Sequence, residues 1–170
     1  MIFMKRIYRI QILFALLTLV PSFGKSQIND GNIRLKVLQK KLIGKELVFG
    51  KWNEKGGMET RLTYLGAVKT NQGKIFKIMN SVWVWGLSQR ATNRILIFNE
   101  KNQYVGNYYL TLTTYLPTKL KNGVLIFQNT DVSCNKNTIT RVNLKNGLPQ
   151  EFFRKCKNDF GDIYGFDGTN

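Results

Sequence analysis

The stretch that decides the fold class spans positions 60–79. It reads Thr60-Arg-Leu-Thr-Tyr-Leu-Gly-Ala-Val-Lys-Thr70, then Asn71-Gln-Gly73, then Lys74-Ile-Phe-Lys-Ile-Met79. Both outer segments are rich in β-branched, aromatic and other apolar residues, whereas Asn-Gln-Gly is typical of a turn. Two such segments joined by a short turn predict a β-hairpin.

Similar apolar segments separated by turn residues recur on both sides of this hairpin. We expect further strands at 46–52, 82–85, 94–98, 103–115, 124–127, 138–144 and 162–166. Short strands at regular intervals are typical of an antiparallel meander that forms a barrel or a sandwich. The sequence therefore predicts an all-β domain with a meander of about eight strands, and both architectures stay open.

One segment before these strands fits two structures. Ile33, Leu35 and Val37 alternate as in a strand, whereas Leu35, Leu38 and Leu42 repeat as in a short helix that Gly44 could end. We favour a short N-terminal helix.

The first 26 residues have the pattern of a secretory signal peptide. Three basic residues lie within the first nine positions, and an apolar run at 10–20 follows them and ends before Pro21. Eleven residues are fewer than the roughly 20 that span a bilayer as a helix. We expect a signal peptide at 1–26 and a single exported β-rich domain at 27–170, periplasmic or secreted. An uncleaved membrane anchor is the alternative.

The chain is strongly basic. It has 26 Lys and Arg residues against ten Asp and Glu residues, a net charge of +16. Four basic residues precede Gln27, so the domain at 27–170 carries 22 against ten, or +12. Such a charge favours an anionic glycan or lipid headgroups as partners, but it also fits a merely solvated lysine-rich surface. Export and the even spread of charge argue against nucleic acid. We expect a monomer with no transmembrane segment after residue 26.

The absence of histidine restricts the chemistry that the chain can perform. The usual general base and the usual zinc ligand are both missing, so we expect no catalytic residue, no metal and no cofactor. Carboxylates are the remaining acid–base groups. They permit a second hypothesis, a small glycan-acting hydrolase with a carboxylate pair drawn from Glu100, Asp131, Asp159 and Asp162.

The segment 81–94 contains the candidate ligand-binding residues. In an extended chain Trp83 and Trp85 point to one face, and the valines beside them point to the other. A strand that is apolar on both faces is usually central and buried, so we expect at least one tryptophan in the core. Alternatively, the two rings form a flat wall for a sugar or a small apolar ligand. Arg90 and Arg94 would then supply charge or a cation–π contact, with 86–93 as the loop at the mouth of the site.

In the segment 103–115, alternation places Tyr104, Tyr108, Leu110 and Leu112 on one face, which we expect to be core. The other face carries threonines and tyrosines, which suit a half-exposed strand and could also bind a glycan.

Cys134 and Cys156 are the two cysteines of the chain. In an oxidising compartment such a pair predicts a disulfide. Asn146-Gly147 predicts a type I′ hairpin turn, because both residues tolerate positive φ. The resulting register would place Arg141 opposite Phe152 and would bring Cys156 close to Cys134.

Gly50-Lys51-Trp52 resembles the Gly-x-Trp of lipocalin-like β-barrels, in which the tryptophan closes one end of the barrel. The match covers three residues, and the turn at 53–57 follows at once, whereas in that family the motif opens a long strand. The chain also resembles small exported bacterial β-sheet proteins of uncharacterised function. That resemblance implies only that the protein is exported, to the periplasm or the cell exterior.

Overall fold

A computed structural model describes residues 30–169, so the signal peptide expected at 1–26 lies outside the described residues. The elements follow in the order α2 (Asp30–Lys40), β1 (Glu46–Asn53), β2 (Gly57–Lys69), β3 (Ile75–Trp85), β4 (Arg90–Asn99), β5 (Tyr104–Leu110), the 3-10 turn η1 (Thr113–Tyr115), β6 (Lys119–Lys121), β7 (Val124–Gln128), β8 (Ile139–Asn143), β9 (Glu151–Lys157) and β10 (Phe160–Gly168). The expected β fold, with one short helix at its start, is confirmed.

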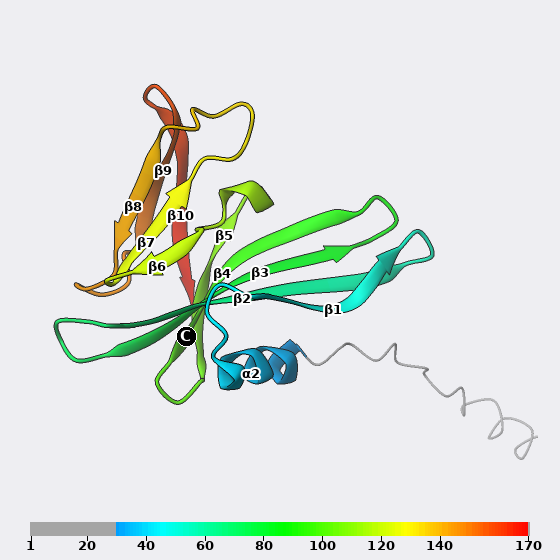
Figure 1. The fold of residues 1–170 in the computed structure, drawn as a ribbon, viewed down its shortest axis with the longest axis horizontal. Helices are drawn as coiled ribbons and strands as arrows, with labels where there is room; N and C mark the ends of the chain where they lie inside the picture. Colours follow the sequence, from blue (N-terminus) through cyan, green and yellow to red (C-terminus); the bar gives the residue numbers. More distant parts are fainter. Residues whose placement is uncertain (1–29, 170) are drawn as a thin grey trace, which may run out of the picture. The chain divides into compact units, whose positions relative to one another are not determined.

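The strands form two antiparallel sheets (Figure 1). The larger sheet has the order β1-β2-β3-β4-β5-β10-β9, and β1 to β5 are a meander of consecutive strands. The smaller sheet has the order β6-β7-β8. Because β1 and β9 are edge strands, the larger sheet does not close on itself, and the barrel alternative is wrong.

Trp52 accordingly plugs no barrel end. It lies near the end of the edge strand β1, partly buried, and its indole Nε1 donates a hydrogen bond to the carbonyl of Gly86 at 2.9 Å. The tryptophan therefore ties β1 to the turn between β3 and β4.

The two sheets share one hydrophobic core. It contains residues from β2 to β5, β7 to β10 and the η1 region. Among its buried members are Ile78, Ile95, Ile97, Tyr108, Leu110, Leu125, Phe127 and Leu144. Burying each side chain of this size stabilises the fold by about 1.5–3 kcal/mol, so this core supplies much of the driving force for folding.

The opposite face of the larger sheet packs against α2. Ile33, Val37 and Leu38 are the buried residues of this helix. They contact a second buried cluster, formed on the sheet by Leu62, Tyr64, Met79, Leu96 and Phe98. Asp30 in the first turn and Lys40 in the last turn complement the helix dipole. The helix, rather than a strand, forms because i, i+4 spacing brings Ile33 and Val37 onto one buried face.

Strand β3 is longer than expected. The apolar segments 74–79 and 82–85 belong to one continuous strand, in which Asn80 pairs with Thr63 of β2 and with Ile95 of β4. Strand β4 begins at Arg90, so the loop expected at 86–93 shortens to a tight turn. Arg90, expected in this loop, therefore lies on the same strand as Arg94.

The prediction of a hairpin at Asn146-Gly147 is wrong. Strand β8 pairs with β7, where Arg141 faces Ile126, and β9 pairs with β10, where Phe152 faces Tyr164. Positions 146–147 instead connect the two sheets, and the side chain of Asn71 donates to that of Asn146 at 2.8 Å. The predicted register is wrong because β9 forms its hairpin with β10 and not with the strand before Asn146.

Candidate ligand-binding surface

The hairpin of β3 and β4 places the four predicted ligand-binding residues on one face. Trp85 pairs with Arg90, and Arg94 pairs with Ser81. Because side chains two residues apart share a face, Trp83, Trp85, Arg90 and Arg94 all lie on the α2-covered face of the sheet, beyond the part that the helix covers.

The two indoles stack on one another. Their centroids are 5.6 Å apart and their planes meet at 26°. The Nε1 of Trp85 donates to the hydroxyl of Thr92 at 3.1 Å, and the guanidinium of Arg90 lies 5.8 Å from the ring centroid of Trp85, within the range of a cation–π contact. These two contacts hold the ring of Trp85 in place, and the ring of Trp83 packs against it.

The expectation that a tryptophan lies in the core is wrong. Trp83 is 38 % exposed and Trp85 is half-buried, whereas Val82 and Val84 fill the core side of the strand. The reason is that no described element covers this end of the sheet face. The rings form a flat aromatic wall that reaches solvent.

Arg94 lies between this wall and β5. It pairs with Tyr109, which is 54 % exposed. The Nε of Arg94 is buried and has no hydrogen-bond partner among the described residues. We define the aromatic–basic surface as Trp83, Trp85, Arg90, Arg94 and Tyr109. Tyr109 belongs to the row of threonines and tyrosines that we expected to be half-exposed and able to bind a glycan, but only the β4–β5 register places it beside Arg94.

Tyr104 lies near this surface. Burial raises the pKa of its phenol, while the charges of Arg34 and Arg94 act in the opposite direction.

Two of the four carboxylates considered for hydrolysis, Asp131 and Asp162, act on the same buried residue, Arg154, whereas Glu100 and Asp159 lie elsewhere. Glu100 lies in the β4–β5 turn, and Asp159 is an exposed partner of Lys155 at 3.3 Å. Asp162 accepts a hydrogen bond from Tyr164 at 3.2 Å. Hydrogen bonds from Ser133 hold the pKa of Asp131 below its ordinary value, which disfavours a general acid at this position. This arrangement does not favour a carboxylate pair acting on one bond.

Within residues 30–169, no three His, Cys, Asp or Glu side chains are placed to hold a metal ion together. None of the helices in the same range is long and apolar enough to cross a membrane.

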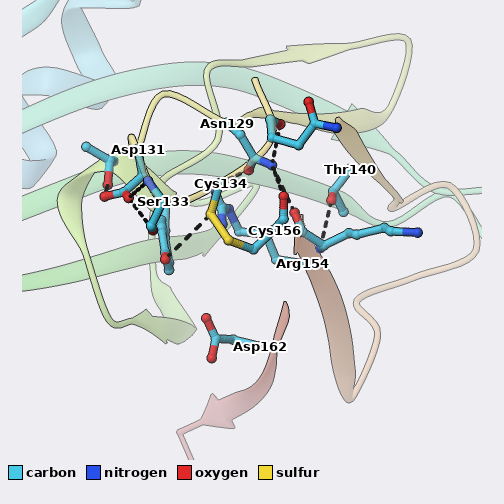
Figure 2. Close-up of a disulfide and its surroundings, with 12 residues drawn as sticks. Asn129, Asp131, Ser133, Cys134, Thr140, Arg154, Cys156 and Asp162 are labelled. Atoms are coloured by element: carbon cyan, nitrogen blue, oxygen red, sulfur yellow. Dashed lines mark hydrogen bonds between the residues drawn. A yellow bond between two sulfur atoms is a disulfide. The ribbon is translucent and has the colours of Figure 1, made fainter. Parts of the chain in front are cut away.

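The disulfide between Cys134 and Cys156 is present, as predicted, with Cα atoms 4.6 Å apart (Figure 2). It lies beside a buried cation that sequence reasoning missed. Arg154 is 0 % exposed, its guanidinium lies 3.8 Å from the ring centroid of Tyr115, and it donates to Asn129. Burial lowers the pKa of Arg154. No pattern in the sequence separates this arginine from the surface ones.

Comparison of the chain with models of protein families, with curated proteins and with solved structures finds no match.

Proposed function

We propose that the protein is an exported, non-catalytic domain that binds an anionic glycan at the aromatic–basic surface. The observation that carries the proposal is the solvent-reaching stack of Trp83 and Trp85 with Arg90 against it. The stack offers an apolar aromatic surface to solvent, with the guanidinium of Arg90 beside it.

This combination suits a sugar that carries acidic groups. The C–H face of a sugar ring is apolar and packs on an aromatic plane, while guanidinium groups pair with carboxylates or sulfates. A net charge of +12 after residue 26 attracts an anionic polymer to this surface. Lipid headgroups would pair with the guanidinium groups but not pack on the indoles, and small apolar ligands would do the reverse.

The disulfide supports export. Such bonds form and persist in oxidising compartments such as the periplasm and the cell exterior, and are rare in the reducing cytosol. A signal peptide at 1–26 would deliver the chain there.

The test is a calorimetric titration of the chain from Gln27 onward with polygalacturonate, neutral dextran and vesicles that contain an anionic phospholipid. We expect binding to polygalacturonate that weakens with salt, because exposed charges are screened beyond about 10 Å at 0.1 M. Dextran should bind far more weakly. Binding to vesicles alone, or equal binding to dextran and polygalacturonate, would contradict the proposal.

A further inference from the structure

A cavity of about 230 Å³ lies on the other face of the larger sheet, away from the aromatic–basic surface. Its floor is a row of paired residues across three strands, Glu46 of β1, Thr63 of β2 and Asn80 of β3. The segment from η1 to Thr118 forms the opposite wall. The cavity is smaller than the roughly 300–1,000 Å³ of sites for drug-sized ligands, so it suits a small molecule.

The floor of the cavity contains hydrogen-bonding groups that the fold does not use. The side-chain amide of Asn80 donates to the carbonyl of Pro117 at 2.8 Å, but its Oδ1 is buried and has no partner in the described part of the chain. A buried acceptor without a donor costs free energy, so such an atom calls for a partner in the cavity. The hydroxyl of Thr63 makes none of the hydrogen bonds described for residues 30–169.

Arg61 adds donors without adding net charge. Its Nε bonds the carboxylate of Glu59 at 2.6 Å, which holds the pKa of Glu59 below its ordinary value. The Nη groups make no hydrogen bond to any of the described residues. Because Glu59 neutralises the guanidinium and Glu46 adds a carboxylate at the cavity, an anionic ligand gains little here.

We propose that this cavity binds a neutral polyhydroxylated ring of monosaccharide size. A hydroxyl donates to the Oδ1 of Asn80 and accepts from the Nη groups of Arg61, and neighbouring hydroxyls bond Thr63 and the threonines of the opposite wall. Each group has a partner because a sugar hydroxyl both donates and accepts. The site goes beyond the proposed function, since Asn80 and Val82 face the cavity while Ser81 and Trp83 face the other way.

The experiment is a ¹H–¹⁵N NMR titration of the chain from Gln27 onward with D-glucose, D-galactose and D-mannose, each used separately. At least one sugar should shift the amide signals of Thr63, Asn80 and Thr114. Thr63→Val keeps the shape of the side chain and should weaken this binding roughly three- to tenfold, which is the loss of one net hydrogen bond. Arg61→Gln should weaken it as well.

Two controls separate this site from others. Thr138→Val makes the same change away from the cavity and should bind like the parent, and Trp83→Ala should weaken polygalacturonate binding while sugar binding stays at the parent level. The proposal is overturned if none of the three sugars shifts the cavity signals. It is also overturned if Thr63→Val, with an otherwise unchanged spectrum, binds as tightly as the parent.

Discussion

Cys134 and Cys156 link segments that belong to different sheets. Cys134 lies in the connection between β7 and β8 of the smaller sheet, and Cys156 lies in β9 at the edge of the larger one. Asn135 donates its backbone N–H to the carbonyl of Cys156 at 2.9 Å, and the side chain of Asn129 donates to the same carbonyl. The disulfide therefore links the two sheets covalently beside the buried Arg154 (Figure 2).

Removal of the disulfide should destabilise the fold without changing it. The bond closes a loop with a sequence separation of 22, for which the chain-entropy model gives about 3 kcal/mol. We expect the urea midpoint of the reduced protein, and of Cys134→Ala/Cys156→Ala, to fall accordingly, with an unchanged far-UV circular dichroism spectrum. An unchanged midpoint would show that the bond does not stabilise the native state.

Arg154 should tolerate an apolar replacement of similar volume better than the loss of its hydrogen-bond acceptor. Its Nε and Nη1 atoms are buried without partners, so the cation is only partly compensated. We expect Arg154→Met to stay within about 1 kcal/mol of the parent or to exceed it. Asn129→Ala removes the hydrogen-bond acceptor of the buried guanidinium and should cost about 1.5–3 kcal/mol.

The double variant provides the control for this comparison. In the Arg154→Met background, Asn129→Ala should cost less than in the parent, because no buried charge remains to be stranded. Equal costs in both backgrounds, measured by urea unfolding, would contradict the account of Arg154.

Buried tyrosines should make the fold sensitive to alkaline pH. Burial raises the pKa of Tyr64, Tyr108 and Tyr164 above the ordinary value of 10.0. The folded state therefore keeps protons that the unfolded chain loses, so this contribution to stability is intact below about pH 10 and declines as the pH rises further.

Tyr108→Phe tests this directly, because Tyr108 is 0 % exposed and its hydroxyl donates to the carbonyl of Pro149 at 2.7 Å. The variant should be about 1 kcal/mol less stable at neutral pH, having lost one hydrogen bond. Its urea midpoint should then fall less steeply than that of the parent above pH 10. Parallel declines would show that the ionisation of Tyr108 does not contribute.

The intact mass of the exported protein tests export directly. When the full chain is expressed in a bacterium with a periplasm, the intact mass of the soluble exported protein should match a chain that begins near Lys25 or Gln27. Recovery from membranes only, with Met1 still present, would mean that the first residues are an anchor.

The sequence was sufficient to predict those features that depend on local pattern. The strands around the turn at Asn71–Gly73 follow from side-chain periodicity, and the disulfide follows from an even cysteine count. The short helix is present, but it ends at Lys40 and buries Ile33, Val37 and Leu38, whereas Leu35 and Leu42 of the expected repeat are exposed. The partner of β9 did not follow, because β8 and β10 offer similar local patterns and only packing of the whole chain selects between them.

Two further errors arose from features that periodicity cannot show. Gly106 pairs with Ile97 and Tyr104 with Phe98, so Val105 is an extra residue in β5. This bulge turns Tyr104 to the α2 face, whereas Tyr108 stays in the core between the sheets. A Cβ at position 106 would collide with the carbonyl of Asp167, so only glycine fits there. The exposure of Trp83 likewise depends on how far α2 extends over the sheet.

The central claim is that the aromatic–basic surface binds an anionic glycan, and Trp83→Ala tests it most directly. Leu87→Ala is the matched control, because Leu87 is 73 % exposed on the turn of the same hairpin and lies outside the stack. In calorimetric titrations with polygalacturonate, we expect Trp83→Ala to weaken binding roughly tenfold, as removal of a central aromatic contact does, and Leu87→Ala to bind like the parent. Equal affinities of Trp83→Ala and the parent would contradict the claim.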